Sequence, residues 1–335
     1  MAGEVRDITI IGGGLTGLFA AFYAGLRGRS TRIIDALPEL GGQLVALYPE
    51  KDVFDVGGFP RILAKDLASN LVEQGLQFDP DVVLEEQIRE IVREEGGFRL
   101  IGRRGEYRTR AVIVAGGKGA LEPMALEVPG YEELLGKGVE HAVKDPSAWA
   151  GKHVVVVGGG DSALDWALIL KDRAASTTLV HRRDGWRAHQ ATVASMEAAV
   201  AAGEITLRTS HEVREIHGTD RVDAVTIFDS RTGADTRLAC DAVFALLGFK
   251  PDLGPIAGWG LDIVKNRVKV SPMMETSVPG IYAAGDLVDY PGKLDLIAAG
   301  FAEAAIAANQ AVHFVDPAAR VNPGHSTASK HFQDR

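Results

Sequence analysis

The sequence predicts an α/β fold because it contains the same strand–turn–helix–strand unit twice. The first unit occupies residues 8–35 and the second occupies residues 153–188. In each unit a run of β-branched residues precedes a glycine-rich turn, and an apolar helical stretch follows that turn. The chain has 335 residues, which is more than one core usually serves. We therefore expect two Rossmann-like domains, each with three layers in a ββα arrangement.

The first turn, GGGLTG, has the glycine spacing of a dinucleotide-binding site. Gly12 lets the backbone turn sharply, Gly14 lets a pyrophosphate approach the helix start, and Gly17 lets the helix pack on the strand. The unpaired N–H groups and the dipole at the helix start favour the phosphates. Asp35 ends the second strand, where a carboxylate accepts hydrogen bonds from a ribose diol and repels a 2′-phosphate. This site suits FAD or NAD better than NADP.

The second turn carries the opposite charge. HVVVVGGGDSALDWA gives a valine strand, a turn and a helix from Asp161. The next strand ends on basic residues, whose guanidinium groups can fork onto a 2′-phosphate. An exposed basic turn is the alternative. Because the two turns differ in charge, we assign FAD to the first and NADPH to the second. The NADPH set is Gly158, Gly160, Asp161, Ser162, Ala163, His181, Arg182, Arg183 and Arg187.

Composition excludes several classes of protein. The net charge of −9 argues against nucleic acid or an anionic membrane as a partner. The start of the chain lacks the apolar core of a signal peptide, and no run of about 18 apolar residues occurs, so we expect a cytoplasmic protein. Cys240 is the single cysteine, which excludes an internal disulfide and a cysteine-based metal cluster. We expect no metal site.

The remaining segments complete the two domains. The Gly- and Pro-rich stretch after Asp35 predicts a long ordered loop across the ligand, with Tyr48 inside it. Residues 61–75 predict an amphipathic helix, and residues 82–114 a small β meander. Further strands are expected at 205–208, 222–228 and 240–251, a helix at 294–313 and a frayed tail beyond it. The expected FAD domain comprises residues 1–118 and 248–335, with the NADPH domain, 119–247, inserted into it.

Two features of these segments permit two interpretations each. The buried strand expected at 276–287 ends on Asp286, which could bind a ribityl hydroxyl at the carboxyl edge of the sheet or cap a helix. Five arginines crowd the meander, and we favour a solvated hairpin face over a docking patch for an acidic partner. They are Arg99, Arg103, Arg104, Arg108 and Arg110.

Nearly the whole chain resembles the low-molecular-weight thioredoxin reductase family. The resemblance rests on GGGLTG, AGGKGA (115–120), GGGDSA, HRRDGWRA and AGD. That family has a redox-active CxxC just before the second glycine turn, and residues 138–160 contain no cysteine here. Without the dithiol, direct reduction of thioredoxin is not expected. A cysteine-free branch, the thioredoxin-reductase-like (type 2) ferredoxin or flavodoxin–NADP⁺ reductases, is more similar. LYPEK (47–51), DVGGFP (55–60) and a tail with HST (325–327) carry that similarity.

The resemblance implies an enzyme that moves electrons between NADPH and ferredoxin or flavodoxin, by hydride transfer to FAD followed by single-electron transfer. It implies a homodimer in which each tail reaches the flavin of the other subunit. Tyr48 and His325 would stack on the two faces of the flavin, with Phe332 as a second candidate for the tail ring, and no acid–base catalyst is needed. The other FAD contacts would be Gly12, Gly14, Thr16, Gly17, Asp35, Gln43, Ile88, Leu121, Asp286 and Thr327.

Glycines at the junctions of the two domains are plausible hinges for bringing nicotinamide to flavin. They are Gly116, Gly117, Gly119 and Gly248.

Other functions share these motifs. An NADPH oxidase, or a reductase that needs a separate disulfide-carrying protein, is one alternative. A non-enzymatic flavin redox sensor is another. A related branch that acts on low-molecular-weight disulfides places a cysteine in the first turn, where this chain has Leu15 and Thr16.

The arginines predict how the protein selects its nucleotide. Substituting Arg182 and Arg183 together should collapse the preference for NADPH over NADH, because the guanidinium groups that match the 2′-phosphate are removed. The measurement is kcat/KM with each nucleotide. Unchanged selectivity would refute the assignment of the 2′-phosphate to these side chains.

Overall fold

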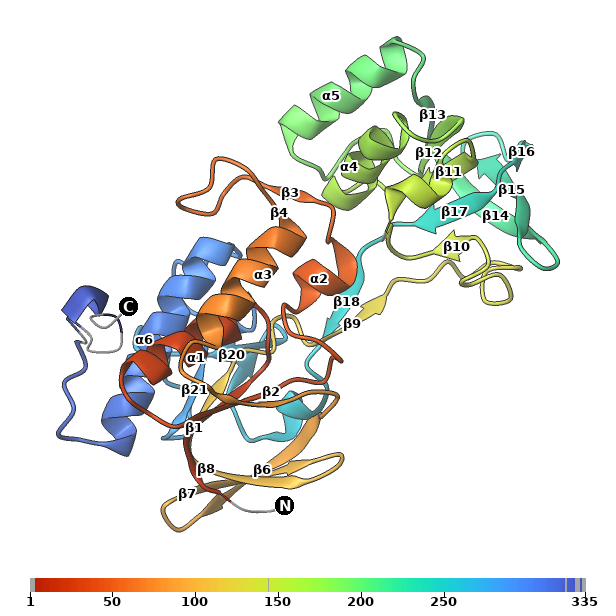
Figure 1. Cartoon of the computed structure of the whole chain (residues 1–335). Coiled ribbons are helices and arrows are strands. Elements are labelled where there is room, and N and C mark those ends of the chain that lie inside the picture. The colour runs from red at the N-terminus through yellow and green to blue at the C-terminus, as the bar shows by residue number, and fades with distance from the viewer. Residues whose placement is uncertain (1–3, 144, 323, 329–331, 333–335) are drawn as a thin grey trace. The chain divides into compact units, whose positions relative to one another are not determined.

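The structure is a computed structural model that describes residues 4–143, 145–322, 324–328 and 332 (Figure 1). The chain forms two compact units. The first unit contains the residues up to Ala120 and from Pro251 onward, and the second contains Leu121–Lys250. Two paired strands, β9 (Ala120–Pro123) and β18 (Phe249–Asp252), lie where the chain passes from one unit to the other.

The first unit is built on a parallel sheet with the order β5-β2-β1-β8-β21. Its central strands are almost fully buried and rich in isoleucine and valine, as expected for a parallel sheet covered on both faces. The strands are β1 (Arg6–Ile11), β2 (Thr31–Ile34), β5 (Asp81–Val83), β8 (Glu106–Val114) and β21 (Ile281–Ala283).

Strand β8 belongs to two layers at once. Along one edge it pairs with β1, from Thr109 to Val114. Along its other edge, Val112–Val114 pair in parallel with β21, whereas residues 106–109 pair antiparallel with β7 (Gly97–Gly102). Strand β6 (Ile88–Glu94) completes this hairpin. The sheet therefore forks at β8 into the parallel layer and the expected meander.

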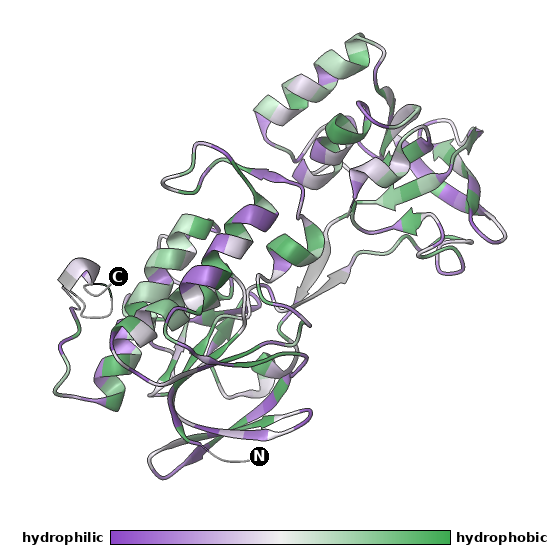
Figure 2. Ribbon diagram, in the orientation of Figure 1, coloured by the Kyte–Doolittle hydropathy of each residue, from purple (hydrophilic) through white to green (hydrophobic). Residues whose placement is uncertain are grey.

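Three helices form the other layer of the first unit. They are α1 (Leu15–Leu26), α3 (Ala64–Gly75) and α6 (Ile297–Val315), and Figure 1 shows them side by side. Both α1 and α6 are rich in alanine and contain two phenylalanines each, and Figure 2 shows them coloured largely hydrophobic. Helix α6 packs along α1, and both contact the central strands. This layer fixes where the first turn of α1 lies relative to the sheet.

Short elements connect these layers. They are α2 (Gln43–Leu47), β3 (Asp52–Val53), β4 (Ile62–Leu63), the 3-10 turns η2 (Gly254–Gly258) and η3 (Ser326–Ala328), and the strands β19 (Ile263–Val264), β20 (Arg267–Lys269) and β22 (Val288–Asp289).

The second unit repeats the plan of the first. Its parallel sheet has the order β10-β17-β11-β12-β13, with the helices α4 (Asp161–Leu170) and α5 (Gln190–Ala201). The strands are β10 (Val139–Glu140), β11 (His153–Val157), β12 (Ser176–His181), β13 (Thr206–Thr209) and β17 (Ala242–Ala245). An antiparallel sheet of β14 (His211–Gly218), β15 (Val222–Asp229) and β16 (Asp235–Ala239) forms the third layer, and η1 (Pro146–Trp149) precedes β11.

The valines of strand β11 pack into two separate hydrophobic cores, one on each face of the sheet. Val154 and Val156 pack with the helices, whereas Val155 and Val157 pack with β14 and β15. Side chains alternate between the faces of a strand, so four consecutive valines fill both sides. The α/β class and the two three-layer units confirm the predicted fold class.

Several predicted boundaries are wrong. The helix expected at 61–75 begins at Ala64, because Ile62 and Leu63 pair with β3 instead. The meander expected at 82–114 begins only at β6, because β5 belongs to the parallel sheet, and the stretch 276–287 contains only three strand residues. The helix expected at 294–313 spans Ile297–Val315, and its N-cap is Leu296, so Asp286 caps no helix there. The sequence reasoning also missed α2, α5, β14 and β16.

Among the described residues, no helix combines the length and the apolar composition needed to cross a bilayer.

Burial makes the single cysteine unreactive. Cys240 lies in the core of the second unit, where burial, with smaller contributions from Asp241 and Asp223, raises the pKa of its thiol to about 12. At pH 8 we expect only about one thiol in ten thousand to be ionised, so a maleimide should label the native protein very slowly. Mass spectrometry should find one label after denaturation. Rapid labelling of the native protein would contradict this prediction.

Candidate functional site

The first glycine turn is packed tightly on one side and open on the other. A Cβ on Gly12 would overlap the carbonyl of Ala115, and one on Gly17 would overlap the carbonyl of Gly12. At Gly14, the N-cap of α1, the nearest atom to an added Cβ would be Gly42 Cα at 3.9 Å. In the described chain, this helix start has no side-chain cap. An open backbone cradle with free N–H groups fits the pyrophosphate of a dinucleotide.

Asp35 is fixed beside this turn at the end of β2. Its carboxylate is buried and accepts hydrogen bonds from the backbone N–H of Gly13 and, at 2.7 Å, of Leu37. Gly13 lacks a Cβ, and an added one would lie 3.0 Å from Asp35 Oδ2. The acid is therefore held in one position, with oxygen lone pairs left for a diol.

The loop after Asp35 passes beside the glycine turn. The N–H of Gly41 donates to the carbonyl of Gly13 at 2.9 Å, and a Cβ on Gly42 would come within 2.8 Å of Gly14 Cα. Gln43 then begins α2, with its amide near Gly117. Tyr48 follows that helix, and Lys51 Nζ lies 5.8 Å from the centre of its ring. Sequence reasoning missed Gly41 and Gly42, although the pair of glycines was a signal for a close backbone approach.

A third segment reaches the same turn from the C-terminal part of the chain. The Thr16 side chain lies between Gly285, which follows β21, and Gly300, which lies in α6. A Cβ added to Gly285 would lie 3.0 Å from Thr16 Oγ1, and one added to Gly300 would lie 2.7 Å from it. Asp286 is half-buried, and Lys118 Nζ lies 3.8 Å from its carboxylate. Lys118 and Gly300 were not predicted. The structure thus brings Gly12, Gly14, Thr16, Gly17 and Asp35 together, with Asp286 next to Gly285.

Other residues predicted for FAD are placed differently. Ile88 is buried in the core at the start of β6. The side chain of Leu121 lies outside the described residues.

Among the described residues, no hydrogen bond, ion pair or ring contact joins the predicted tail residues to this turn. His325 and Thr327 are exposed. Arg27, at the C-terminal end of α1, donates to the carbonyls of Arg320 and Val321. Nearby, the ring of Phe332 lies 5.9 Å from that of Phe78. Because α1 is 12 residues long, this anchor lies about 18 Å from the glycine turn.

The second glycine turn is also open at the N-cap of its helix, but a histidine ring packs against it where the first turn has a carboxylate. Gly160 is the N-cap of α4, and an added Cβ there would meet nothing within 4 Å. A Cβ on Gly159 would overlap the ring of His181. The ring stacks on Trp186 with 4.8 Å between centroids, and its Nε2 lies 3.0 Å from the carbonyl of Gly185. Burial chiefly, together with the neighbouring arginines, lowers the pKa of His181, so the ring is neutral at pH 7 and supports the turn.

The basic segment after β12 is docked on this turn. Arg187 N donates to the carbonyl of Gly159 at 2.9 Å, and His189 N donates to the Asp161 carboxylate at 2.8 Å. Ala163 is buried against Gly158, and Ser162 is half-buried beside it. The Arg182, Arg183 and Arg187 side chains are exposed, and none forms an ion pair with another described residue. Three unpaired guanidinium groups beside an open helix start fit an anion such as a 2′-phosphate.

Four of the five hairpin arginines differ because an acidic side chain compensates their charge. Arg99 and Arg108 pair with Glu94, Arg104 pairs with Glu85, and Arg110 pairs with Asp7. These contacts favour the interpretation as a solvated hairpin face over that as a free basic patch.

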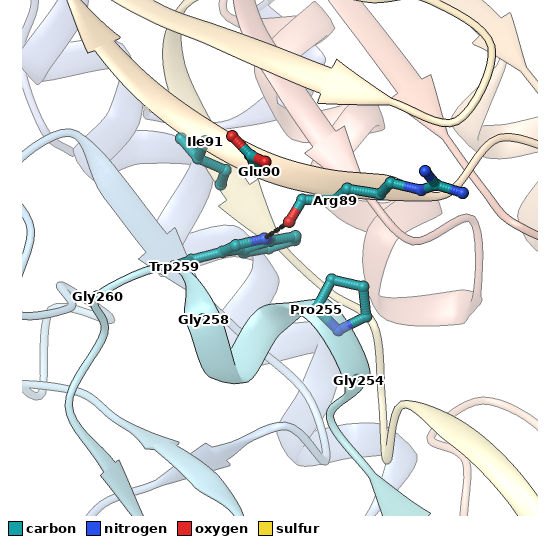
Figure 3. Close-up of a pocket in the computed structure, with 8 residues that line it drawn as sticks. All are labelled: Arg89, Glu90, Ile91, Gly254, Pro255, Gly258, Trp259 and Gly260. Atoms are coloured by element: carbon teal, nitrogen blue, oxygen red, sulfur yellow. Dashed lines mark hydrogen bonds between the residues drawn. The ribbon is translucent and has the colours of Figure 1, made fainter.

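A separate hollow of about 700 Å³ lies between β6 and η2 (Figure 3). The Trp259 indole forms one wall and donates to the carbonyl of Arg89 at 2.9 Å. None of its eight lining residues belongs to the predicted cofactor sets. The chemistry therefore points to the glycine turns and not to this hollow. Among the described residues, no cluster of three His, Cys, Asp or Glu side chains could hold a metal ion.

Comparison with known proteins shows the family of the chain. The family model for pyridine nucleotide-disulphide oxidoreductases matches residues 6–311. The chain belongs to this family. It is 49% identical to a ferredoxin–NADP reductase from Thermus thermophilus over 98% of each chain. It is 46% identical to a ferredoxin–NADP reductase from Halalkalibacterium halodurans, covering 97% of this chain and 98% of that one.

Solved structures of the pyridine nucleotide-disulphide oxidoreductase fold extend the likeness. The thioredoxin reductase of T. acidophilum is 26% identical with a TM-score of 0.81, covering 95% of this chain and all of that one. A bacillithiol disulfide reductase from Staphylococcus aureus, at 21% identity and a TM-score of 0.76 over 93% of this chain and 99% of that one, shares the fold. The family and the branch predicted from the motifs are confirmed.

The glycines of the first turn predict two distinct effects of adding a methyl group. Gly17→Ala should destabilise the protein by about 2 kcal/mol or more, since its Cβ has no space against Gly12. Gly14→Ala should leave the unfolding midpoint of the cofactor-free protein nearly unchanged and weaken dinucleotide binding at least about tenfold, because its Cβ enters the open cradle. Thermal unfolding and FAD titration measure the two effects. Equal effects of both substitutions on stability would contradict the assignment.

Proposed function

We propose that this protein is an FAD-dependent ferredoxin–NADP⁺ reductase. The observation that carries the proposal is the pair of open glycine turns with opposite charges, Asp35 beside one and three unpaired arginines beside the other. Full-length relatives named ferredoxin–NADP reductase support it. The sequence also lacks the dithiol that a thioredoxin reductase requires, since it holds one cysteine and that thiol is buried.

In this proposal the first unit holds FAD. The turn from Gly12 to Gly17 would bind the pyrophosphate, Asp35 the adenosine ribose, and Asp286 a ribityl hydroxyl. Tyr48 would stack on one face of the flavin ring. The remaining contacts of the predicted shell are Thr16, Gln43, Ile88, Leu121 and Thr327.

The second unit would hold NADPH. Gly158 and Gly160 would admit its pyrophosphate at the start of α4, with Ser162 and Ala163 in the first turn of that helix. Arg182, Arg183 and Arg187 would bind the 2′-phosphate. Asp161 and His181 would act indirectly, because their hydrogen bonds hold the basic segment against the turn.

Bound FAD would supply the chemistry, since a flavin accepts a hydride from NADPH and releases electrons singly. The chain's own residues bind, orient and shield the two cofactors. None of these steps requires a side chain to act as a general acid or base.

A homodimer completes the proposed FAD site. The tail is anchored at the far end of α1, by Arg27 and at Phe78, so His325 is available to a flavin in a second copy of the chain. Ferredoxin or flavodoxin would bind only transiently, because electron-transfer partners must dissociate after each turnover. A cytoplasmic location stays a prediction from the sequence.

Two other functions use the same cofactors and make different predictions. An NADPH oxidase, or a reductase acting through a separate dithiol protein, would pass electrons to oxygen or to a disulfide. A flavin redox sensor would bind NADPH without turnover. The exposed arginine set would serve NADPH binding in each of these functions, so turnover itself has to be measured.

Stopped-flow spectroscopy tests the proposal. NADPH should bleach the flavin absorbance of the holoprotein rapidly, and oxidised ferredoxin should restore it at least about a hundredfold faster than air does. Cytochrome reduction that depends on ferredoxin, compared with aerobic peroxide formation, gives the steady-state counterpart. Reoxidation by air alone at the same rate would support the oxidase, and absence of reoxidation by ferredoxin would exclude the reductase.

A further inference from the structure

A buried carboxylate on α6 holds the loop that carries Asp286. Glu303 and Lys293 are only 2% and 5% exposed, and Lys293 Nζ donates to Glu303 Oε1 at 2.7 Å. The Tyr290 hydroxyl donates to the same oxygen at 2.8 Å. The backbone N–H of Gly285 donates to the other oxygen, Oε2, at 2.7 Å. Both oxygens of the carboxylate are therefore bonded.

All three donors come from one short segment, residues 285–293. Taking a carboxylate and an ammonium group out of water is costly, and apolar pairs in their place are often equally stable. Stability alone therefore does not explain this arrangement. Its specific consequence is that a single side chain fixes the segment at Gly285, Tyr290 and Lys293, and Asp286 lies between the first two of these points.

The anchored segment also contacts the first glycine turn. Gly285 faces the Thr16 side chain in the first turn of α1, and so does Gly300, which precedes Glu303 by one turn of α6. Thr16 thus fits between two glycines whose relative position depends on the Glu303 bond to Gly285 N. The carboxylate sets the spacing between the α1 turn and the Asp286 loop.

We infer that Glu303 and Lys293 are positioning residues for FAD, which hold the Gly285–Tyr290 loop against the start of α1. The inference rests on the proposed function. Neither residue needs to contact the cofactor. Their role is to present Asp286 and the glycine turn at a fixed separation, so that one dinucleotide engages both without ordering the loop on binding.

FAD release from the holoprotein tests this inference. In Glu303→Gln, the side chain keeps only one acceptor oxygen, so it cannot accept both from the Gly285 N–H and from Tyr290 and Lys293. In the double variant K293M/E303L, two apolar side chains replace the pair, which keeps the core filled and leaves no buried charge unpaired. Both variants should release FAD at least about tenfold faster than the wild type on dilution, measured by the rise in flavin fluorescence.

Two further readouts separate positioning from general stability. The unfolding midpoint of the cofactor-free double variant should stay within a few degrees of the wild type, and the visible circular dichroism of its bound flavin should change. The matched control is Asp316→Asn, which removes the ion pair of Asp316 with Arg29, 2.7 Å apart, at the other end of α6. This control should release FAD at the wild-type rate.

Wild-type release rates in both test variants would overturn the inference, as would equally fast release from Asp316→Asn. A stoichiometric FAD content in the wild type establishes the FAD part of the proposed function first, so the two failures are distinguishable. Absence of FAD from the wild-type holoprotein would overturn the proposed function and the inference together.

Discussion

Close backbone packing around Gly12 determines how the first unit is assembled. The turn rests on the carbonyl of Ala115 after β8, and α1 packs on the turn through Gly17. Because neither position leaves space for a Cβ, the end of β1, the start of α1 and the end of β8 are held at backbone contact distance. At Gly14, by contrast, an added Cβ would meet no atom closer than 3.9 Å, so this side of the turn is open while the side at Gly12 and Gly17 is closed. A pyrophosphate site needs the open space for the ligand and the tight packing, since the free N–H groups must be held rigidly in place.

The same packing recurs in the second unit, and the difference between the units is electrostatic. In the first, a buried carboxylate beside the turn accepts two backbone N–H groups. In the second, the ring of His181 lies against the turn, and burial with nearby arginines lowers its pKa, which keeps the ring neutral. The positive charge stays on arginines that point to solvent. One backbone plan thus carries a carboxylate beside one turn and exposed arginines beside the other, the charges that the proposed FAD and NADPH sites require.

Local chemistry decides which parts of this arrangement could be predicted from sequence. The glycine turns, Asp35 and the arginines after β12 were predicted because spacing along the chain dictates their geometry. The start of α3 was not, because Ile62 and Leu63 are apolar residues that suit a helix as well as the strand they form with β3. The roles of Gly300, Lys293 and Glu303 could not be predicted from sequence for another reason. They arise only when α6 packs against the loop after β21.

The position of the tail could not be predicted from sequence either, because it depends on contacts with a distant part of the chain. By composition the last residues would fray, yet Arg27 binds the carbonyls of Arg320 and Val321 at the C-terminal end of α1. In the proposed FAD site a dinucleotide would extend from the N-terminal end of that helix, so the two ends of α1 would have separate tasks: one would bind the cofactor, and the other anchors the tail. A chain with no dithiol relay has to expose its flavin to an external acceptor. In the proposed homodimer, a cover supplied by the tail of a second copy would reconcile protection of the flavin with access to it.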